Sequence, residues 1–127
     1  MAMTQIRRKA KKEVNMSYPR YEVFKDIKGE FRFNLIAKNY KTILSSSEGY
    51  KNKSDCLNAI GICQRNSPFD KHYDKRTTWS GKFYFTLRSD NGRDIGRSED
   101  YETSWSRDQG IQDVKRDGPT QNVVDKT

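Results

Sequence analysis

The sequence predicts a small α+β domain made of two tandem β-β-β-α repeats, packed as one unit with approximate two-fold symmetry. Gly29–Leu35 reads GEFRFNL and recurs 52 residues later, at Gly81–Leu87, as GKFYFTL. Aromatic residues make up 12% of the chain and fall in alternating runs, which indicates a packed core although 33% of the residues are charged. At 127 residues there is room for one compact domain. Because a unit of about 40 residues rarely completes a core alone, both copies are expected to share one core.

The similarity between the copies covers most of the chain. It runs to Pro68 in the first copy and to Pro119 in the second, with one deletion, and aligns Ser47 with Ser98. We therefore expect one domain with two flanking segments: a basic flexible arm at 1–17, the domain at 18–119 with repeats at about 21–68 and 73–119, and a disordered tail at 120–127.

Alternating apolar residues predict the first two strands of the first repeat. Tyr21–Phe24 alternates, and Asp26–Gly29 supplies a turn. Phe31, Phe33 and Leu35 then recur with period two. Residues with that spacing share one face of a strand, so we expect these three side chains to face the core.

Turn residues predict the rest of the sheet. Lys38–Lys41 turns the chain into a third short strand at Thr42–Ser45. The second copy has Asn91-Gly92 at the matching turn, a strong hairpin signal because both positions accept positive φ. Tyr73–Trp79, which opens the second copy, is rich in charge. We therefore expect an edge strand or an irregular loop there.

A helix is expected after the third strand of each copy. The first should begin near Asn52 or Ser54 and end before Pro68. Its apolar stripe, at helical spacing, is Cys56, Ala59, Ile60 and Cys63. The apolar stripe of the second helix is Trp105, Ile111 and Val114. Gly110 interrupts this stripe, so the second helix should be the less stable of the two.

The net charge of +8 is concentrated at the N-terminus. The net charge is +5 for residues 1–20, +3 for residues 21–69 and zero for residues 70–127. The basic cluster could bind a polyanion, or it could form a solvated, frayed arm; it consists of Arg7, Arg8, Lys9, Lys11 and Lys12. Met16 is a second plausible start, since the repeat pattern begins just after it.

Several classes of site lack their sequence signals. His72 is the sole histidine, and neither a metal-ligand pattern nor a Ser-His-Asp relay accompanies it. We expect no metal and no cofactor. Cys56 and Cys63 lie seven residues apart on one helix face, too far apart to bridge, and are expected to be reduced. No apolar stretch is long enough to cross a bilayer, which predicts a cytoplasmic protein without a membrane partner.

The repeated pattern resembles the YegP-like family of small domains. Each copy has a strand that fits Gly-x-Phe/Tyr-x-Phe-x-Leu, then an Asn-containing turn, an Ile, a Ser-Glu-x-Tyr motif and a helix. The resemblance covers about 21–119. It implies a β-β-β-α repeat, whose single-copy versions dimerise, and it implies no catalytic residues. Asp100 stands where the first copy has Gly49, so any binding surface is not simply two-fold.

The Ser-Glu-x-Tyr motif occurs twice, with Glu48 and Tyr50 in the first copy and Glu99 and Tyr101 in the second. A carboxylate beside a phenol could perform acid–base chemistry. Its presence in both halves favours a structural role, in which the tyrosines fill space under the helices and the glutamates bind loop N–H groups or a nearby arginine. We therefore expect a protein that is not an enzyme.

Two surfaces are candidates for binding a macromolecule. Arg32, Tyr84 and Arg88 fall on the strand face opposite the core, where bases could stack or where the face is simply solvated or contacts protein. Tyr40, Arg76 and Trp79 fall in or near turns, where exposed aromatics often anchor protein interfaces. The sequence thus predicts a protein-binding adaptor or inhibitor, monomeric or weakly dimeric. The alternative is RNA or DNA binding through the arm and the outer sheet face.

Overall fold

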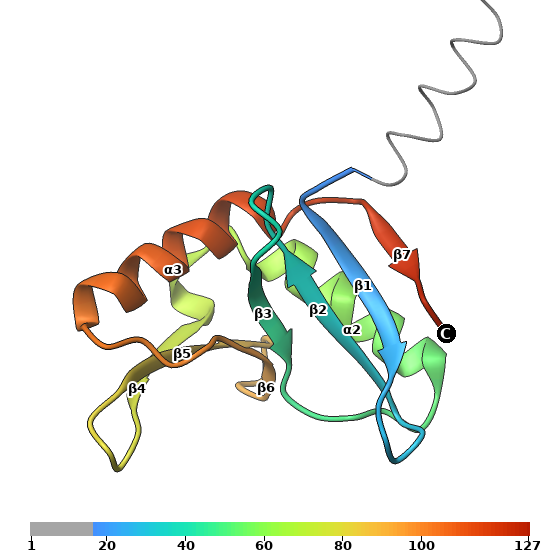
Figure 1. Cartoon of the computed structure of the whole chain (residues 1–127), viewed down its shortest axis with the longest axis horizontal. Coiled ribbons are helices and arrows are strands. Elements are labelled where there is room, and N and C mark those ends of the chain that lie inside the picture. The colour runs from blue at the N-terminus through green and yellow to red at the C-terminus, as the bar shows by residue number, and fades with distance from the viewer. Residues whose placement is uncertain (1–16) are drawn as a thin grey trace, which may run out of the picture.

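Residues 17–127 are described by the computed structural model, shown in Figure 1. The first half contains β1 (Arg20–Lys25), β2 (Phe31–Ile36), β3 (Thr42–Ser46) and α2 (Lys53–Asn66). A short 3-10 turn, Asp70–His72, leads into the second half, with β4 (Tyr73–Thr77), β5 (Phe83–Arg88), β6 (Asp94–Arg97) and α3 (Ser104–Asp117). A last strand, β7 (Val123–Asp125), follows. Residues 1–16 of the predicted arm, with its five basic residues, lie outside the described residues.

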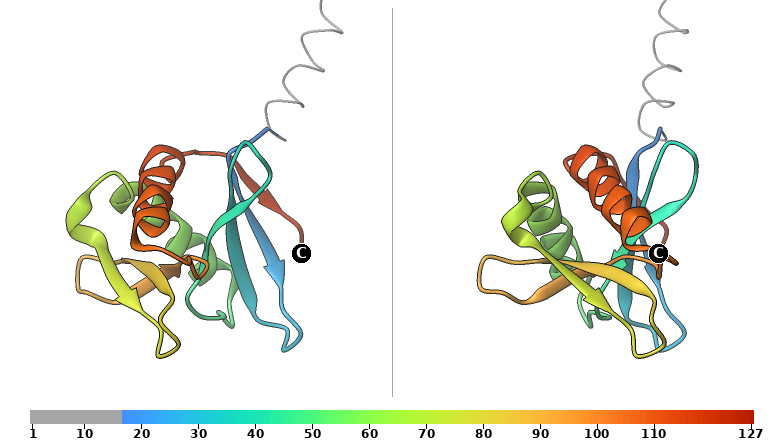
Figure 2. Two further views of the ribbon diagram at one scale, coloured as in Figure 1. Left: turned by 60° about the vertical axis from the view of Figure 1, so that its left-hand side comes forward. Right: turned by 90° about the vertical axis from the view of Figure 1, so that its left-hand side faces the viewer.

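One seven-stranded sheet carries both helices, which makes the α+β prediction correct. The strand order is β4-β5-β6-β3-β2-β1-β7, and β4 is an edge strand, as its charge predicted. The halves meet where β3 and β6 run antiparallel, with Ser45 opposite Arg97 and Ser46 opposite Gly96. Figure 2 shows both helices on the same side of the twisted sheet.

The core lies between the sheet and the two helices. Period-two side chains of the strands are fully buried there, among them Tyr21, Phe33, Leu35, Phe85 and Leu87. From α2 the predicted stripe of Cys56, Ala59, Ile60 and Cys63 packs against them. Burial removes these apolar surfaces from water, which is the main favourable term in folding.

The predicted stripe of α3 was wrong at Trp105, which is 69% exposed. Six helical residues rotate a side chain by roughly 240°, so Trp105 lies on a different face from buried Ile111. Arg107 and Gly110 occupy the buried face instead. Thr103 caps this helix by accepting a hydrogen bond from the Ser106 N–H at 3.0 Å.

The predicted disordered tail at 120–127 was also wrong. Val123–Asp125 pairs with β1 in parallel. The Tyr21 N–H donates to the Asn122 carbonyl at 2.9 Å, and the Lys126 N–H donates to the Val23 carbonyl at 2.8 Å. The outer edge of β1 offers unpaired backbone groups, and pairing them is favourable for a polar segment with little apolar surface.

The loops before the two helices make matching contacts with the sheet. Phe31 and Tyr50 exchange two backbone hydrogen bonds, at 2.7 and 2.8 Å, and Phe83 and Tyr101 do the same at 2.9 and 2.7 Å.

Two buried serines make a second matching contact. The Ser46 hydroxyl accepts from the Phe33 N–H at 3.3 Å, and the Ser98 hydroxyl accepts from the Phe85 N–H at 3.0 Å. Ser46, rather than Ser47, is therefore the counterpart of Ser98, and the deletion lies between these serines and the tyrosines.

Candidate functional site

The sequence-predicted binding residues do not form one site. Tyr40 lies in the β2–β3 turn, where its φ is 68°, and is 73% exposed. Its ring contacts the Tyr18 ring edge-on, with 4.8 Å between the ring centroids. Trp79 lies in the β4–β5 turn, at the opposite end of the molecule in Figure 1. A single partner that contacts both residues would have to span the domain.

The guanidinium of Arg76 on the outer sheet face is bound by its own carboxylate neighbours. It donates twice to Asp94, at 2.8 and 2.9 Å, and once to Asp74 at 2.8 Å. Arg88 donates to the Gly92 carbonyl at 2.7 Å. The Arg76–Asp94 pair is bidentate, and hydrogen bonds from a charged guanidinium are strong, so these two arginines are held in place.

The remaining outer-face candidates are also engaged. Arg32 donates to Asp26 at 2.8 Å, and this bond lowers the pKa of the Asp26 carboxyl. Arg97 lies over the Tyr84 ring at 4.0 Å and pairs with Asp100 at 3.0 Å. A phosphate or a base would have to displace these contacts, which reduces what the face offers to nucleic acid.

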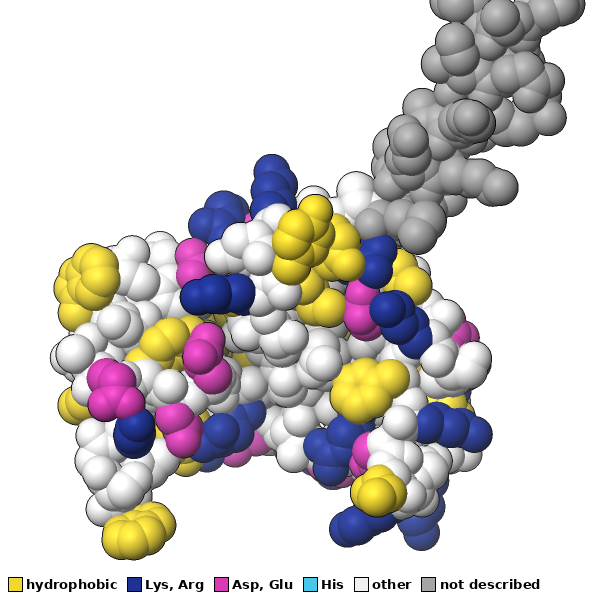
Figure 3. All heavy atoms as spheres, in the orientation of Figure 1, with side chains coloured by type: hydrophobic (Ala, Val, Ile, Leu, Met, Phe, Trp, Pro, Cys, Tyr) yellow, Lys and Arg dark blue, Asp and Glu magenta, His cyan; other side chains and the backbone are white. Residues whose placement is uncertain are grey.

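Two hairpin tips carry fully exposed apolar side chains. Ile27 in the β1–β2 turn is 103% exposed and Trp79 in the β4–β5 turn is 100% exposed. Each turn closes on a glycine with positive φ, Gly29 at 81° and Gly81 at 88°. Figure 3 shows hydrophobic side chains projecting from both loops at the lower edge of the molecule.

Sequence reasoning identified Trp79 and missed Ile27. The two residues are 52 positions apart, the same offset that relates the repeated strands. That offset was the signal that could have paired them. We call Ile27 and Trp79 the tip pair.

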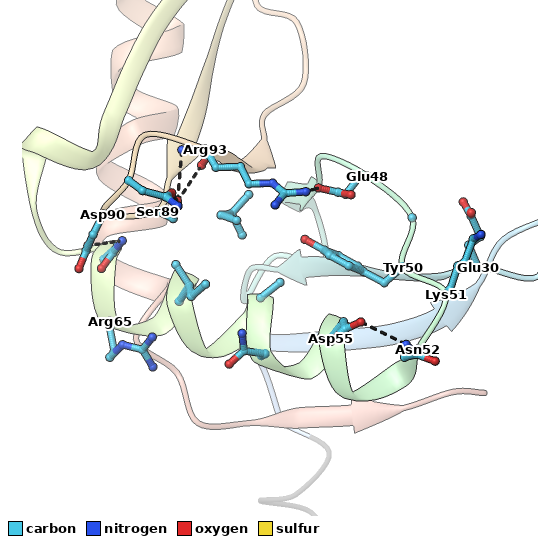
Figure 4. A pocket seen from close by; sticks show the side chains of 17 residues that line it. Glu30, Glu48, Tyr50, Lys51, Asn52, Asp55, Arg65, Ser89, Asp90 and Arg93 are labelled. Atoms are coloured by element: carbon cyan, nitrogen blue, oxygen red, sulfur yellow. Dashed lines mark hydrogen bonds and ion pairs between the residues drawn. The ribbon is translucent and has the colours of Figure 1, made fainter.

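A polar groove of about 840 Å³ runs beside α2 (Figure 4). Its sides are α2, the loop at 48–52 and the β5–β6 turn at 89–93. One stripe of α2 faces it, at three- and four-residue spacing: Asp55, Asn58, Ala59, Ile62 and Arg65. Three segments distant in sequence must assemble to form this space, so spacing along the chain did not reveal it.

Hydrogen bonds and an ion pair hold the walls of the groove together. The buried amide of Asn66, at the end of α2, donates to the Arg88 carbonyl at 3.0 Å and to Asp90 at 3.3 Å. Arg93 reaches from the β5–β6 turn to Glu48 at 3.2 Å. The predicted pairing of a motif glutamate with an arginine is thus confirmed for Glu48.

Tyr50 closes the groove toward the sheet. Its hydroxyl is buried and has no hydrogen-bond partner within residues 17–127. Burial, with a contribution from Glu48, raises the pKa of Tyr50 to about 12, so the phenol is neutral and can donate a hydrogen bond.

The second half accommodates its tyrosine differently. A Cβ at Gly110 would lie 2.3 Å from the Tyr101 hydroxyl oxygen, so that ring occupies the space a side chain would need. Ala59 stands at the matching position of α2. Its methyl denies Tyr50 the same position, and Tyr50 points instead toward the space between α2 and the β5–β6 turn (Figure 4).

Outside the groove, the titratable side chains of residues 17–127 bear on two further kinds of site, metal-ligand clusters and reactive thiols. In residues 17–127, no three His, Cys, Asp or Glu side chains gather as metal ligands. Cys56 and Cys63 are free and buried; burial raises the pKa of Cys56 to about 11 and that of Cys63 further. Neither described helix is long and apolar enough to cross a membrane.

Comparison with known proteins places the chain in a family. The family model described as a domain of unknown function (DUF1508) matches it twice, at residues 26–74 and 80–125. The chain belongs to the DUF1508 family. Each matched segment contains the second and third strands of one repeat and the helix that follows them, and the YegP-like resemblance is confirmed.

Relatives of this DUF1508 chain span nearly the same length. The UPF0339 protein in the ptx operon 5' region of Stutzerimonas stutzeri is 42% identical over 105 residues, 83% of this chain and 94% of the relative. The UPF0339 protein YegP of Escherichia coli K12 is 42% identical over 107 residues, 84% of this chain and 96% of the relative.

Two solved structures share the fold of this DUF1508 chain. The solution NMR structure of Escherichia coli yegP superposes with a TM-score of 0.82 at 40% identity, covering 87% of this chain and 95% of that one. UPF0339 protein SO3888 of Shewanella oneidensis gives 0.78 at 38% identity, covering 83% and 88%. The former is described as a protein of unknown function.

Proposed function

We propose that this DUF1508 protein is a non-enzymatic protein-binding module, an adaptor or an inhibitor, that contacts its partner through the tip pair. The observation that supports the proposal is the complete exposure of Ile27 and Trp79 at matching hairpin tips. Large apolar side chains on a protein surface are the common anchors of interfaces. Neither residue contributes to the core, so stability of the fold does not account for them.

The proposal includes an approximate two-fold relation between two β-β-β-α units, with the axis between β3 and β6. The repeated sequence, the two family-model segments and the matching Phe31–Tyr50 and Phe83–Tyr101 bonds support it. Under this relation the two tips are equivalent loops of the two units. A partner that contacts both tips would present two apolar depressions.

Charged residues beside the Ile27 tip indicate the chemistry of the partner surface. Exposed Lys25 and Lys28 flank Ile27, and Lys28 forms no ion pair in the described part of the chain. The partner surface is therefore acidic around the depression that receives Ile27. Nucleic-acid binding through the sheet face is the less favoured alternative, because Arg32, Arg76 and Arg88 are already engaged.

Affinity capture of the full-length tagged chain from extract of its native cell, after nuclease treatment, tests the proposal. The double variant Ile27→Ser/Trp79→Ala should retain at least tenfold less of a discrete protein than the unmodified chain. Trp105→Ala removes an exposed tryptophan from α3 and is the matched control, expected to capture normally. Equal capture by all three proteins, at equal melting temperatures, would refute the tip pair as the binding surface.

A further inference from the structure

We propose that the groove beside α2 is a second binding site, which takes an extended peptide of about four residues with an acidic group at its Arg65 end. This site uses none of the tip-pair residues. Its test is independent of the function proposed above.

The dimensions of the groove fit an extended chain. Asp55 and Arg65 mark its two ends on α2, ten helical residues apart. At 1.5 Å per residue the helix covers about 15 Å between them. An extended peptide advances about 3.3 Å per residue, so four to five residues fill that length.

The hydrogen-bonding groups in the groove suit a peptide backbone. The exposed amide of Asn58 has no hydrogen-bond partner within residues 17–127 and offers one acceptor and two donors. The Tyr50 hydroxyl is a neutral donor whose own hydrogen bond is unmade. A buried donor left without a partner is unfavourable; because this hydroxyl is closed to solvent, a peptide carbonyl supplies the missing acceptor only when the surrounding side chains shift. Ala59 and Ile62 supply an apolar floor for one side chain.

The charges of the groove determine at which end of the groove the acidic group of the peptide lies. Arg65 is exposed and forms no ion pair in the part of the chain that the structure describes. The nearby carboxylate of Asp90 is 88% exposed, accepts a hydrogen bond from the Asn66 amide at 3.3 Å and lies 3.6 Å from Nε2 of His72. Carboxylates of Asp55 and Glu30 lie toward the other end, beside Lys51. An acidic group is therefore attracted to Arg65 and repelled from the opposite end.

Two random tetrapeptide pools, both N-acetylated, are the probes. One ends in aspartate and the other in lysine amide. At millimolar concentration the aspartate pool should shift the backbone amide resonances of 58–66 and 89–93 in the ¹⁵N-labelled full chain, and the lysine pool should not. Arg65→Gln and Asn58→Ala should each reduce the shifts at least fivefold. Gln109→Ala, the matching change on α3, should leave them unchanged.

Absence of shifts at the groove with the aspartate pool would overturn the proposal. So would shifts that persist in Arg65→Gln, or shifts of equal size with the lysine pool. Shifts confined to the hairpin turns would assign the peptide to the tip pair and would also overturn it.

Discussion

Replacing Gly110 by alanine tests whether Tyr101 packs directly against α3. A Cβ at this position would lie 2.3 Å from the Tyr101 hydroxyl oxygen, 2.7 Å from its Cζ and 3.2 Å from Cε2 of Phe85. Two backbone hydrogen bonds between Phe83 and Tyr101 fix the backbone from which the Tyr101 ring projects. The helix or the ring must therefore shift to admit one methyl group.

Two opposing terms set the magnitude. Alanine is favoured over glycine in a helix interior by about 1 kcal/mol. Overpacking a well-packed core is unfavourable by about 1–3 kcal/mol, and three atoms inside 3.4 Å of the new Cβ place Gly110→Ala at the upper end. We expect a net loss of about 1–2 kcal/mol. For a domain of this size that lowers the melting temperature by roughly 4–8 °C.

Gly61→Ala is the matched control on α2. The nearest atom to its new Cβ is Nη1 of Arg65, at 3.5 Å, an ordinary contact with a flexible side chain. Only the propensity gain remains, so this variant should melt up to about 4 °C higher than the unmodified chain. Thermal and urea unfolding followed by far-UV circular dichroism measures both variants. If Gly110→Ala is as stable as the unmodified chain, Tyr101 does not fill that space, and the account of why Tyr50 points elsewhere fails.

Three further outcomes are expected. Ser98→Ala should lower the free energy of unfolding by about 1–2 kcal/mol, because the buried Phe85 N–H loses its 3.0 Å partner; urea unfolding measures this, and an unchanged midpoint would contradict it. The bond from Arg32 lowers the pKa of Asp26 in the folded state below the ordinary value near 3.9, so this carboxylate stabilises the fold above that pH and the contribution is lost as the pH falls through the lowered pKa. Asp26→Asn should therefore flatten the fall in stability below about pH 4, and an unchanged acid limb would contradict the assignment. Burial raises the pKa of Cys56 to about 11, so about one thiol in a thousand is ionised at pH 8; native protein should resist iodoacetamide while urea-unfolded protein reacts at Cys56 and Cys63, and rapid native labelling would show that α2 opens.

Period-two aromatic spacing explains why the strands and the core were predictable. Phe31, Phe33 and Leu35 alternate with Arg32 and Asn34, and only one register turns all three apolar side chains toward the core. The helical stripe of Cys56 to Cys63 follows the same logic with a period of 3.6. These patterns are local, so each can be seen within a few residues of sequence.

Features that depend on distant segments could not be predicted in this way. The strand Val123–Asp125 forms because the edge of β1 accepts it, and its own three residues carry no apolar alternation. Trp105 was assigned to the core by hydrophobicity, although its angular position on α3 turns it to solvent. Gly110 looked like a weakness of the helix, and the packing of Tyr101 gives it a reason.

The same distinction between local and distant features applies to the candidate sites. Trp79 in a turn was recognisable from sequence, whereas the exposure of Ile27 became apparent only when the two turns were compared in the structure. Pairing of Arg76 with Asp94 and stacking of Arg97 on Tyr84 join residues 18 and 13 apart, across strands whose register the sequence alone did not give. The groove requires the β5–β6 turn of one half and the helix of the other.

Site-specific photo-crosslinking in the native cell tests the tip pair most directly. A benzophenone amino acid is placed at position 27, 79 or 40, since Tyr40 is also exposed, at 73%, but lies at the opposite end of the domain. Crosslinks to the same discrete protein from positions 27 and 79, and none from position 40, are the predicted result. Crosslinking from position 40 alone, or from none of the three positions, would contradict the proposal that the hairpin tips bind a protein partner.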